Sequence, residues 1–121
     1  MTKELTFAEA LQVIVGEKLS SVSFVMDYWQ LDFDGHGFSI FTSISVLEDG
    51  KVERNGSLGF RNALCEQIAK IVAKVEFQEG ILAIEFADNA KIHVFARDED
   101  YGQSPEALVF QSYRFKALYV V

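Results

Sequence analysis

The chain has few residues that could form a cross-link and no long apolar run that could span a membrane. Its 121 residues include one cysteine, Cys65, so an internal disulfide and a thiolate-rich zinc site are both excluded. No apolar run approaches the roughly 18 residues that a membrane-spanning helix needs. Near the start, Glu4 and Glu9 stand where an export signal has basic and apolar residues. These absences predict a protein of the reducing cytoplasm with no membrane segment.

Basic residues are also scarce. The chain has 11 Lys and Arg against 18 Asp and Glu, a net charge of -7, and no basic residue falls between Leu19 and Gly50. Because binding to nucleic acid requires a basic surface that displaces counterions, no nucleic-acid partner is expected. Acidic surfaces attract cationic partners and speed their encounter. The alternative is that the acidity serves solubility alone.

Apolar residues, by contrast, are plentiful. They make up 50% of the chain, and 11 of them are phenylalanine, a composition far from that of disordered chains. The length suits one domain. The only proline, Pro105, lies in a predicted loop, and no Pro- or Ser-rich linker divides the chain. Residues 1–121 are therefore predicted to share a single core.

The sequence repeats itself after a shift of 53 residues. Identical residues then align as Phe7 with Phe60, Ala10 with Ala63, Leu11 with Leu64, Val22 with Val75, Phe24 with Phe77 and Phe33 with Phe86. The matches are mainly apolar, as expected if the shared feature is a core pattern. We predict an internal duplication with copies at about residues 6–47 and 59–112.

Each copy begins with a predicted amphipathic helix. Thr6 and Glu9 form a capping-box pattern, and Gly16 fits a left-handed C-terminal cap. The two apolar stripes comprise Phe7, Leu11, Ile14 and Val15 in the first helix, and Phe60, Leu64, Ile68 and Ile71 in the second. Cys65 falls within the second helix and is predicted to be buried there as a small apolar residue.

Alternating strands follow each helix. Val22 and Phe24 alternate with serines, and Phe24 and Phe77 are predicted to be buried at equivalent positions. Tight turns such as Asp34-Gly35 join the strands, which makes neighbours antiparallel. The predicted fold class is α+β, with two helices packed on an antiparallel β-sheet, curved or split, and built from a duplicated helix–β-hairpin unit.

Patterns for catalysis or metal binding are mostly missing. His36, in a predicted turn, and His93, on a strand, lack the spacing of a zinc site and are predicted to lie on the surface. Asp32 and Glu85 are equivalent in the two copies, so one alternative is a small enzyme or ligand-binding protein that uses Asp32, Glu85 and His93. The same carboxylates suit solvated strand positions. We predict no enzyme activity, no metal and no cofactor.

Acidic residues and tyrosines gather in two segments. Their composition is typical of an interface with a basic partner, although aromatic strand residues more often belong to a core. The predicted partner-binding residues are Asp27, Tyr28, Asp32, Asp98, Glu99, Asp100 and Tyr101.

The second half contains the phrases LCEQIAKIV, LAIEFADN, RDED and GQSPEA in that order, and the first half repeats the opening phrases in LQVIVGEKLSSVSFVMDYWQLDF. This pattern resembles small bacterial immunity proteins of contact-dependent growth inhibition and related polymorphic toxin systems. Ala69 stands where the pattern has a second helix-ending glycine. The resemblance implies a cytoplasmic protein that binds and blocks a cognate toxin domain, here a cationic nuclease-type domain. A subunit of a larger assembly is a further alternative.

Overall fold

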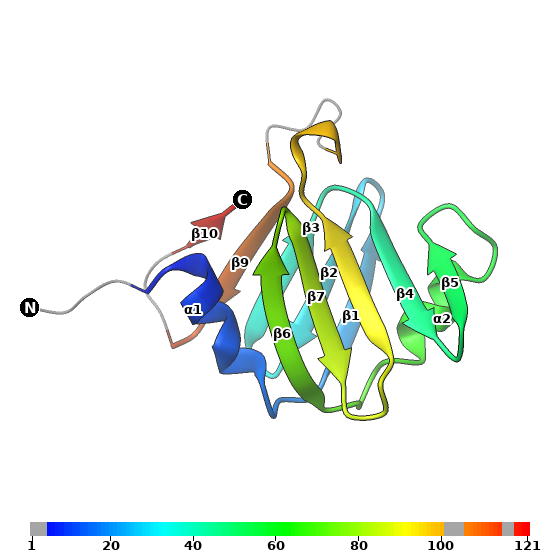
Figure 1. Cartoon of the computed structure of the whole chain (residues 1–121), viewed down its shortest axis with the longest axis horizontal. Coiled ribbons are helices and arrows are strands. Elements are labelled where there is room, and N and C mark those ends of the chain that lie inside the picture. The colour runs from blue at the N-terminus through cyan, green and yellow to red at the C-terminus, as the bar shows by residue number, and fades with distance from the viewer. Residues whose placement is uncertain (1–4, 101–105, 115–117) are drawn as a thin grey trace, which may run out of the picture.

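The computed structural model describes residues 5–100, 106–114 and 118–121 (Figure 1). Its first half opens with a short helix and a 3₁₀ turn, α1 (Phe7–Leu11) and η1 (Gln12–Ile14). Five strands follow: β1 (Ser21–Val25), β2 (Tyr28–Phe33), β3 (His36–Ile40), β4 (Ile44–Glu48) and β5 (Lys51–Arg54).

The second half repeats this order of elements. It comprises α2 (Phe60–Cys65), β6 (Val72–Gln78), β7 (Ile81–Phe86), β8 (Lys91–Phe95), the 3₁₀ turn η2 (Asp98–Asp100), β9 (Leu108–Ser112) and β10 (Tyr119–Val120). Predicted partner residue Tyr101 lies outside the described residues.

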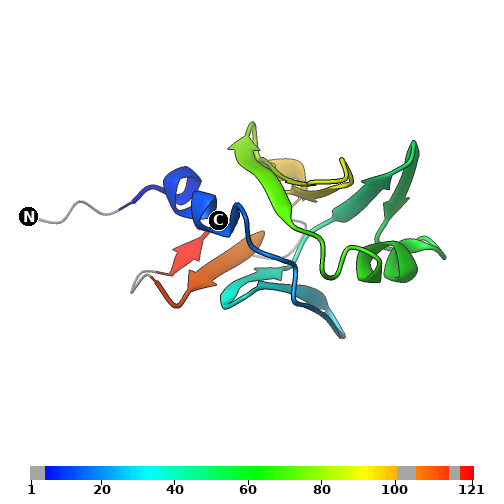
Figure 2. The same cartoon turned by 90° about the horizontal axis from the view of Figure 1, so that it is seen from below.

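The strands form two antiparallel sheets that face each other, as Figure 2 shows from below. The strand orders are β1-β2-β3-β9-β10 and β5-β4-β8-β7-β6. Each half of the chain therefore gives three consecutive strands to one sheet and its next two strands to the other. The predicted α+β class with antiparallel strands is confirmed, and the strands make two facing sheets.

The two helices are shorter than their apolar stripes predicted. The capping box is present, because Glu9 N–H donates to Thr6 Oγ1 and Thr6 N–H donates to Glu9 Oε1. However, Val15, Ile68 and Ile71 are exposed. Both helices end after about one and a half turns. The apolar residues at the end of each predicted stripe therefore lie outside the helix and away from the core.

The core lies between the sheets and consists of residues that alternate along the strands. Phe33 and Phe86, at equivalent positions of the two halves, are both completely buried. The prediction for Phe24 is wrong: its side chain is 36% exposed, with the Arg61 guanidinium 5.4 Å from the ring centroid. Phe77 instead packs at the core margin, 5.1 Å from Phe7 between ring centroids. The difference arises because an aromatic ring covers Phe77, whereas Phe24 has a charged side chain over it.

The segments that follow the helices pair with each other. Gly16 N–H donates to Val72 O and Ala69 N–H donates to Leu19 O, at 2.8 and 2.7 Å. Lys18 and Ile71 form an antiparallel bridge between these segments. Gly16 and Ala69 both have positive φ angles, 89° and 79°. This backbone conformation suits glycine and is strained for alanine.

We expect Ala69→Gly to stabilise the protein by about 1 kcal/mol, because glycine adopts this φ without the Cβ clash. The mirror variant Gly16→Ala should destabilise it by a similar amount. An added Cβ at Gly16 would meet no atom within 4 Å, so that loss would report backbone strain alone. Urea unfolding of both variants measures the effect. A less stable Ala69→Gly protein would contradict the assignment of strain at this position.

Candidate partner-binding surface

The predicted partner-binding residues do not form one surface. The β1–β2 turn, which carries exposed Asp27, and η2, with Asp98 to Asp100, lie at the same end of the sheets (Figure 1). Asp32 is the fifth residue of β2, so it lies roughly 15 Å from that turn at about 3.4 Å per residue. It faces outward on the first sheet, where it lines a shallow concavity of about 510 Å³. Among the predicted residues, those of the turn and of the acidic loop share only an end of the sheets.

The acidic loop is partly neutralised by its own arginine, which pairs with two of its three carboxylates. Arg97 Nε lies 2.8 Å from Asp100 Oδ2 and 3.3 Å from Glu99 Oε1, and Arg97 N–H also donates to Asp100 Oδ2. The hydrogen bond from Arg97 holds the pKa of Asp100 below its ordinary value. The Asp100 side chain is only 11% exposed, whereas that of Glu99 is 71% exposed. Glu99 is thus the more accessible of these two carboxylates.

Tyr28 and Asp32 are partly engaged within the chain. The Tyr28 ring lies 5.1 Å from the Phe41 ring between centroids, and its side chain is half-buried. Asp32 accepts hydrogen bonds from Ser20 Oγ at 3.1 Å and from Gly35 N–H at 3.2 Å. Both residues therefore support the β1–β2–β3 meander, in addition to any role at an interface.

A different surface gathers carboxylates from two elements. A hollow of about 270 Å³ lies between the β4–β5 hairpin and α2, lined by four carboxylates and one ammonium group. We call it the acidic hollow: Glu48, Asp49, Glu53 and Glu66, with Lys51. Among the described residues, Asp49, Glu53 and Glu66 make no ion pair. Grouped carboxylates without a counter-charge favour the approach of a cation.

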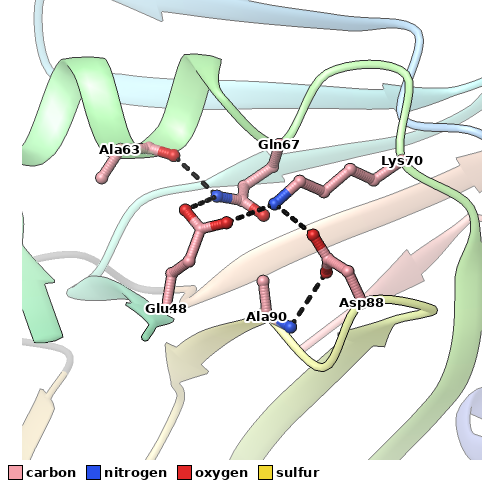
Figure 3. A network of polar contacts seen from close by, with 6 residues as sticks. All are labelled: Glu48, Ala63, Gln67, Lys70, Asp88 and Ala90. Atoms are coloured by element: carbon pink, nitrogen blue, oxygen red, sulfur yellow. Dashed lines mark hydrogen bonds and ion pairs between the residues drawn. The ribbon is translucent and has the colours of Figure 1, made fainter. Parts of the chain in front are cut away.

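One side of the acidic hollow is fixed by a network of polar contacts (Figure 3). Lys70 Nζ lies between two carboxylates, 2.5 Å from Glu48 Oε2 and 2.7 Å from Asp88 Oδ2. Gln67 Nε2 donates to Glu48 Oε1 at 3.1 Å and to Ala63 O at 3.0 Å. The network ties the end of β4 to the segment after α2 and to the β7–β8 turn.

The network also fixes the charge state of its members. The hydrogen bond from Lys70 lowers the pKa of both Glu48 and Asp88. Burial works to lower the pKa of Lys70, but hydrogen bonds to Asp88 and Glu48 outweigh it and raise that pKa. All three groups are therefore charged at neutral pH, and the Glu48 carboxylate is held in place at the rim of the acidic hollow.

Sequence reasoning missed Glu53 and Glu66 as candidate binding residues. Glu48 and Asp49 were visible as the acidic end of the segment without basic residues. Glu53 lies on edge strand β5 and accepts a hydrogen bond from Ser57 Oγ at 2.7 Å, while Glu66 caps the end of α2. Glu48, Asp49 and Glu53 share the β4–β5 hairpin. Glu66 joins them only because α2 packs against β4 and β5, and residues close together in the chain do not predict that contact.

The alternative site at Asp32, Glu85 and His93 is not assembled. Glu85 and His93 share the outer face of the second sheet, where they line a small hollow of about 90 Å³. Asp32 lies on the outer face of the first sheet. Because both sheets and the core separate the two carboxylates, Asp32 and Glu85 do not form a pair.

Two further predictions about single residues are also wrong. His36 is completely buried at the start of β3; its Nδ1 lies 2.6 Å from Ser112 Oγ and its ring stacks on Tyr113. Burial lowers the His36 pKa, and Nε2 has no hydrogen-bond partner among the described residues. His36 is buried because β3 begins at this residue and directs it inward with Phe38. Cys65, in turn, is exposed at the end of α2.

Other kinds of site find no support in the described residues. In this part of the chain, no three His, Cys, Asp or Glu side chains gather closely enough to hold a metal ion. No described helix has both the length and the apolar character needed to cross a membrane. Comparison with known proteins gives no match to a family model, a curated protein or a solved structure.

Proposed function

We propose that this protein is a toxin-neutralising immunity protein that binds and blocks a cognate basic toxin domain. The observation that carries the proposal is the acidic hollow, where Asp49, Glu53 and Glu66 lie together without an ion-pair partner among the described residues. A lysine or arginine side chain of the toxin would enter this hollow. The net charge of -7 would speed the encounter.

The interface we propose is of ordinary size for a tight inhibitor, about 1,200–2,000 Å² in total. Such an area extends well beyond the acidic hollow, so neighbouring surfaces would take part. Asp27 and Glu99 are exposed and would contribute mainly to long-range attraction. Asp32, at the other end of β2, would add to the field without direct contact. Inhibition of this kind needs no catalytic step, metal or cofactor in this chain.

The proposed setting is the bacterial cytoplasm, where a toxin of the same cell or a neighbour would be met. This fits the single cysteine, which gives no reason to expect an oxidising compartment. The excess of acidic residues makes nucleic acid an unfavourable partner for the protein itself. We propose that a protein toxin is the partner and that neither a membrane nor a nucleic acid is bound.

We also propose that the fold arose by duplication of a helix plus five-strand unit. The two β-hairpins have the same register at positions related by 53 residues: Val22↔Leu31 and Phe24↔Trp29 match Val75↔Ile84 and Phe77↔Leu82. The bridge between Lys18 and Ile71 joins residues with the same relation, as a two-fold axis between the halves requires. In each half, the last two strands would then pair in the sheet formed by the first three strands of the other half.

We expect the double variant Glu53→Gln/Glu66→Gln to bind the toxin roughly 10- to 100-fold more weakly, because two carboxylates of the acidic hollow lose their charge. The assay uses the toxin domain encoded by the gene next to that of this protein, with binding measured at several salt concentrations. Weaker binding should come with a shallower salt dependence.

The matched control removes the same charge elsewhere, by Glu76→Gln/Glu79→Gln at the β6–β7 hairpin. This control should bind within about threefold of the wild-type protein. Co-expression adds a functional readout, since the wild-type protein should restore growth of cells that make the toxin. Equal losses in both double variants would remove the acidic hollow from the interface. Absence of any binding or rescue by the wild-type protein would refute the immunity function.

A further inference from the structure

Strand β1 is an edge strand without the features that usually prevent edge pairing. The two sheets have four edges: β1, β10, β5 and β6. β10 has two residues, β5 reads KVER, and β6 carries Lys74 and Glu76 and a register shift near Val72. Short length, charge and irregularity are devices that block association through an edge. β1 reads SVSFV, with no charge and no proline, and pairs with β2 over five consecutive residues.

The free backbone groups of β1 are those of Val22 and Phe24. A two-residue turn joins β1 to β2, and the pair next to it is Val25↔Tyr28. In a hairpin of this kind, the pair beside the turn exchanges hydrogen bonds, and the pattern alternates along the strand. Val25, Ser23 and Ser21 therefore bond to β2. Val22 and Phe24 direct their N–H and C=O groups away from it, toward the open edge.

Apolar side chains accompany this open edge. Phe24, Val25 and Met26 are 36, 39 and 94% exposed. A hollow of about 370 Å³ separates the β1–β2 hairpin from the 56–61 segment, in which Leu58 is fully exposed. Exposed apolar groups beside unpaired strand groups mark a surface that another chain covers.

We infer that β1 pairs antiparallel with β1 of a second copy of this chain, about a two-fold axis at Ser23. In this register Val22 of one copy lies opposite Phe24 of the other, so the outward backbone groups of both strands meet. Ser23 lies opposite Ser23. The two first sheets join into one continuous sheet, and Phe24 and Met26 are covered on the side that faces the second sheet.

Charge complementarity favours a second copy as the occupant. Two chains of net charge -7 repel each other in general, but β1 itself carries no charge. The register places exposed Asp27 of one copy beside the 18–20 segment of the other, where exposed Lys18 is the basic residue. Neither Asp27 nor Lys18 has an ion-pair partner among the described residues. The two-fold axis generates this pair twice, as an isologous interface requires.

Sedimentation and light scattering of the purified protein alone test the inference, independently of any toxin. The wild-type protein is expected to approach twice 13.6 kDa at concentrations of about 100 µM. Ser23→Lys places two ammonium groups opposite each other at the axis and should weaken association roughly 100-fold or more. Ser23 is exposed, so this variant should fold normally, which circular dichroism would check.

A charge-pairing experiment tests the register itself. Ser23→Glu should also be monomeric, whereas a mixture of Ser23→Lys and Ser23→Glu should regain the dimer mass, because only unlike charges then meet at the axis. Gln30→Lys is the matched control: it lies on the same exposed row, one strand in from the edge, and should remain dimeric. A monomeric wild-type protein, a dimeric Ser23→Lys protein or a mixture that stays monomeric would each overturn the inference. A monomer that instead gains a strand from the toxin would assign the β1 edge to that partner.

Discussion

Truncation of Phe33 or Phe86 to alanine is expected to lower the free energy of unfolding by about 3–5 kcal/mol. Both side chains are completely buried between the two sheets, and Phe33 also packs edge to face on Phe38 with ring centroids 5.8 Å apart. Removing a ring deletes buried apolar surface and leaves a cavity in a close-packed interior. Because the two positions are equivalent in the two halves, we expect similar losses in urea unfolding.

Phe24→Ala provides the control for this prediction. Phe24 is also a phenylalanine, but its side chain is 36% exposed on edge strand β1. The expected loss in the free energy of unfolding is therefore about 1 kcal/mol. These measurements should use dilute protein, because self-association would stabilise the folded state by mass action. A loss under about 1 kcal/mol at both Phe33 and Phe86 would contradict the placement of these rings in the core.

The second large effect is expected from Lys70→Met, which should reduce stability by about 2 kcal/mol at pH 7. Methionine preserves much of the side-chain packing but leaves Glu48 and Asp88 near each other without their shared cation. The Asp88 side chain is 49% exposed and that of Glu48 is 26% exposed, so water screens part of the repulsion. For this reason the expected loss is below that of breaking a fully buried ion pair.

The pH dependence distinguishes this electrostatic effect from lost packing. Lys70 lowers the pKa of Glu48 and Asp88 in the folded protein, from ordinary values of 4.5 and 3.8. The contribution is therefore complete above those values and disappears as the pH falls through the lowered ones. The difference between wild type and Lys70→Met should shrink as the pH falls below those ordinary values.

Lys74→Met is the matched control for that variant. Lys74 is 64% exposed and lies 3.9 Å from Glu76, so its removal should change stability by less than about 0.5 kcal/mol. A Lys70→Met loss that is constant from pH 7 to pH 3 would assign the effect to packing, and the network would then contribute little through its charges.

The acidic residues of the candidate site could be predicted from the sequence only in part. The excess of carboxylates, and the segment without basic residues, predicted an acidic surface, and Glu48 and Asp49 at the end of that segment line the acidic hollow. The Asp98 to Asp100 run was predicted to bind a partner, yet Arg97 immediately before it pairs with Asp100. Closeness in the sequence does not predict whether an arginine and a carboxylate form an ion pair. The geometry of the 3₁₀ turn decides whether Arg97 contacts the carboxylates that follow it.

The sequence by itself determined that antiparallel strands follow a helix in each half of the chain. Period-two apolar alternation, the Thr6–Glu9 capping box and the tight turns predicted antiparallel strands after each helix, because these features depend on residues close together in the chain. The shift of 53 residues is the basis of the proposed duplication.

Only the tertiary structure decided which strands share a sheet. β3 pairs with β9 and β4 pairs with β8, between residues 44 to 76 positions apart, and local patterning carries no information about such partners. In the resulting two-sheet arrangement, Asp32 lies on the outer face of the first sheet and Glu85 on the outer face of the second. The same arrangement leaves β1 as an edge strand of the first sheet. The packing of α2 against the β4–β5 hairpin gathers the carboxylates of the acidic hollow. Both the proposed toxin surface and the proposed dimer edge arise from long-range packing, because proximity between distant segments is fixed by the burial of a shared core.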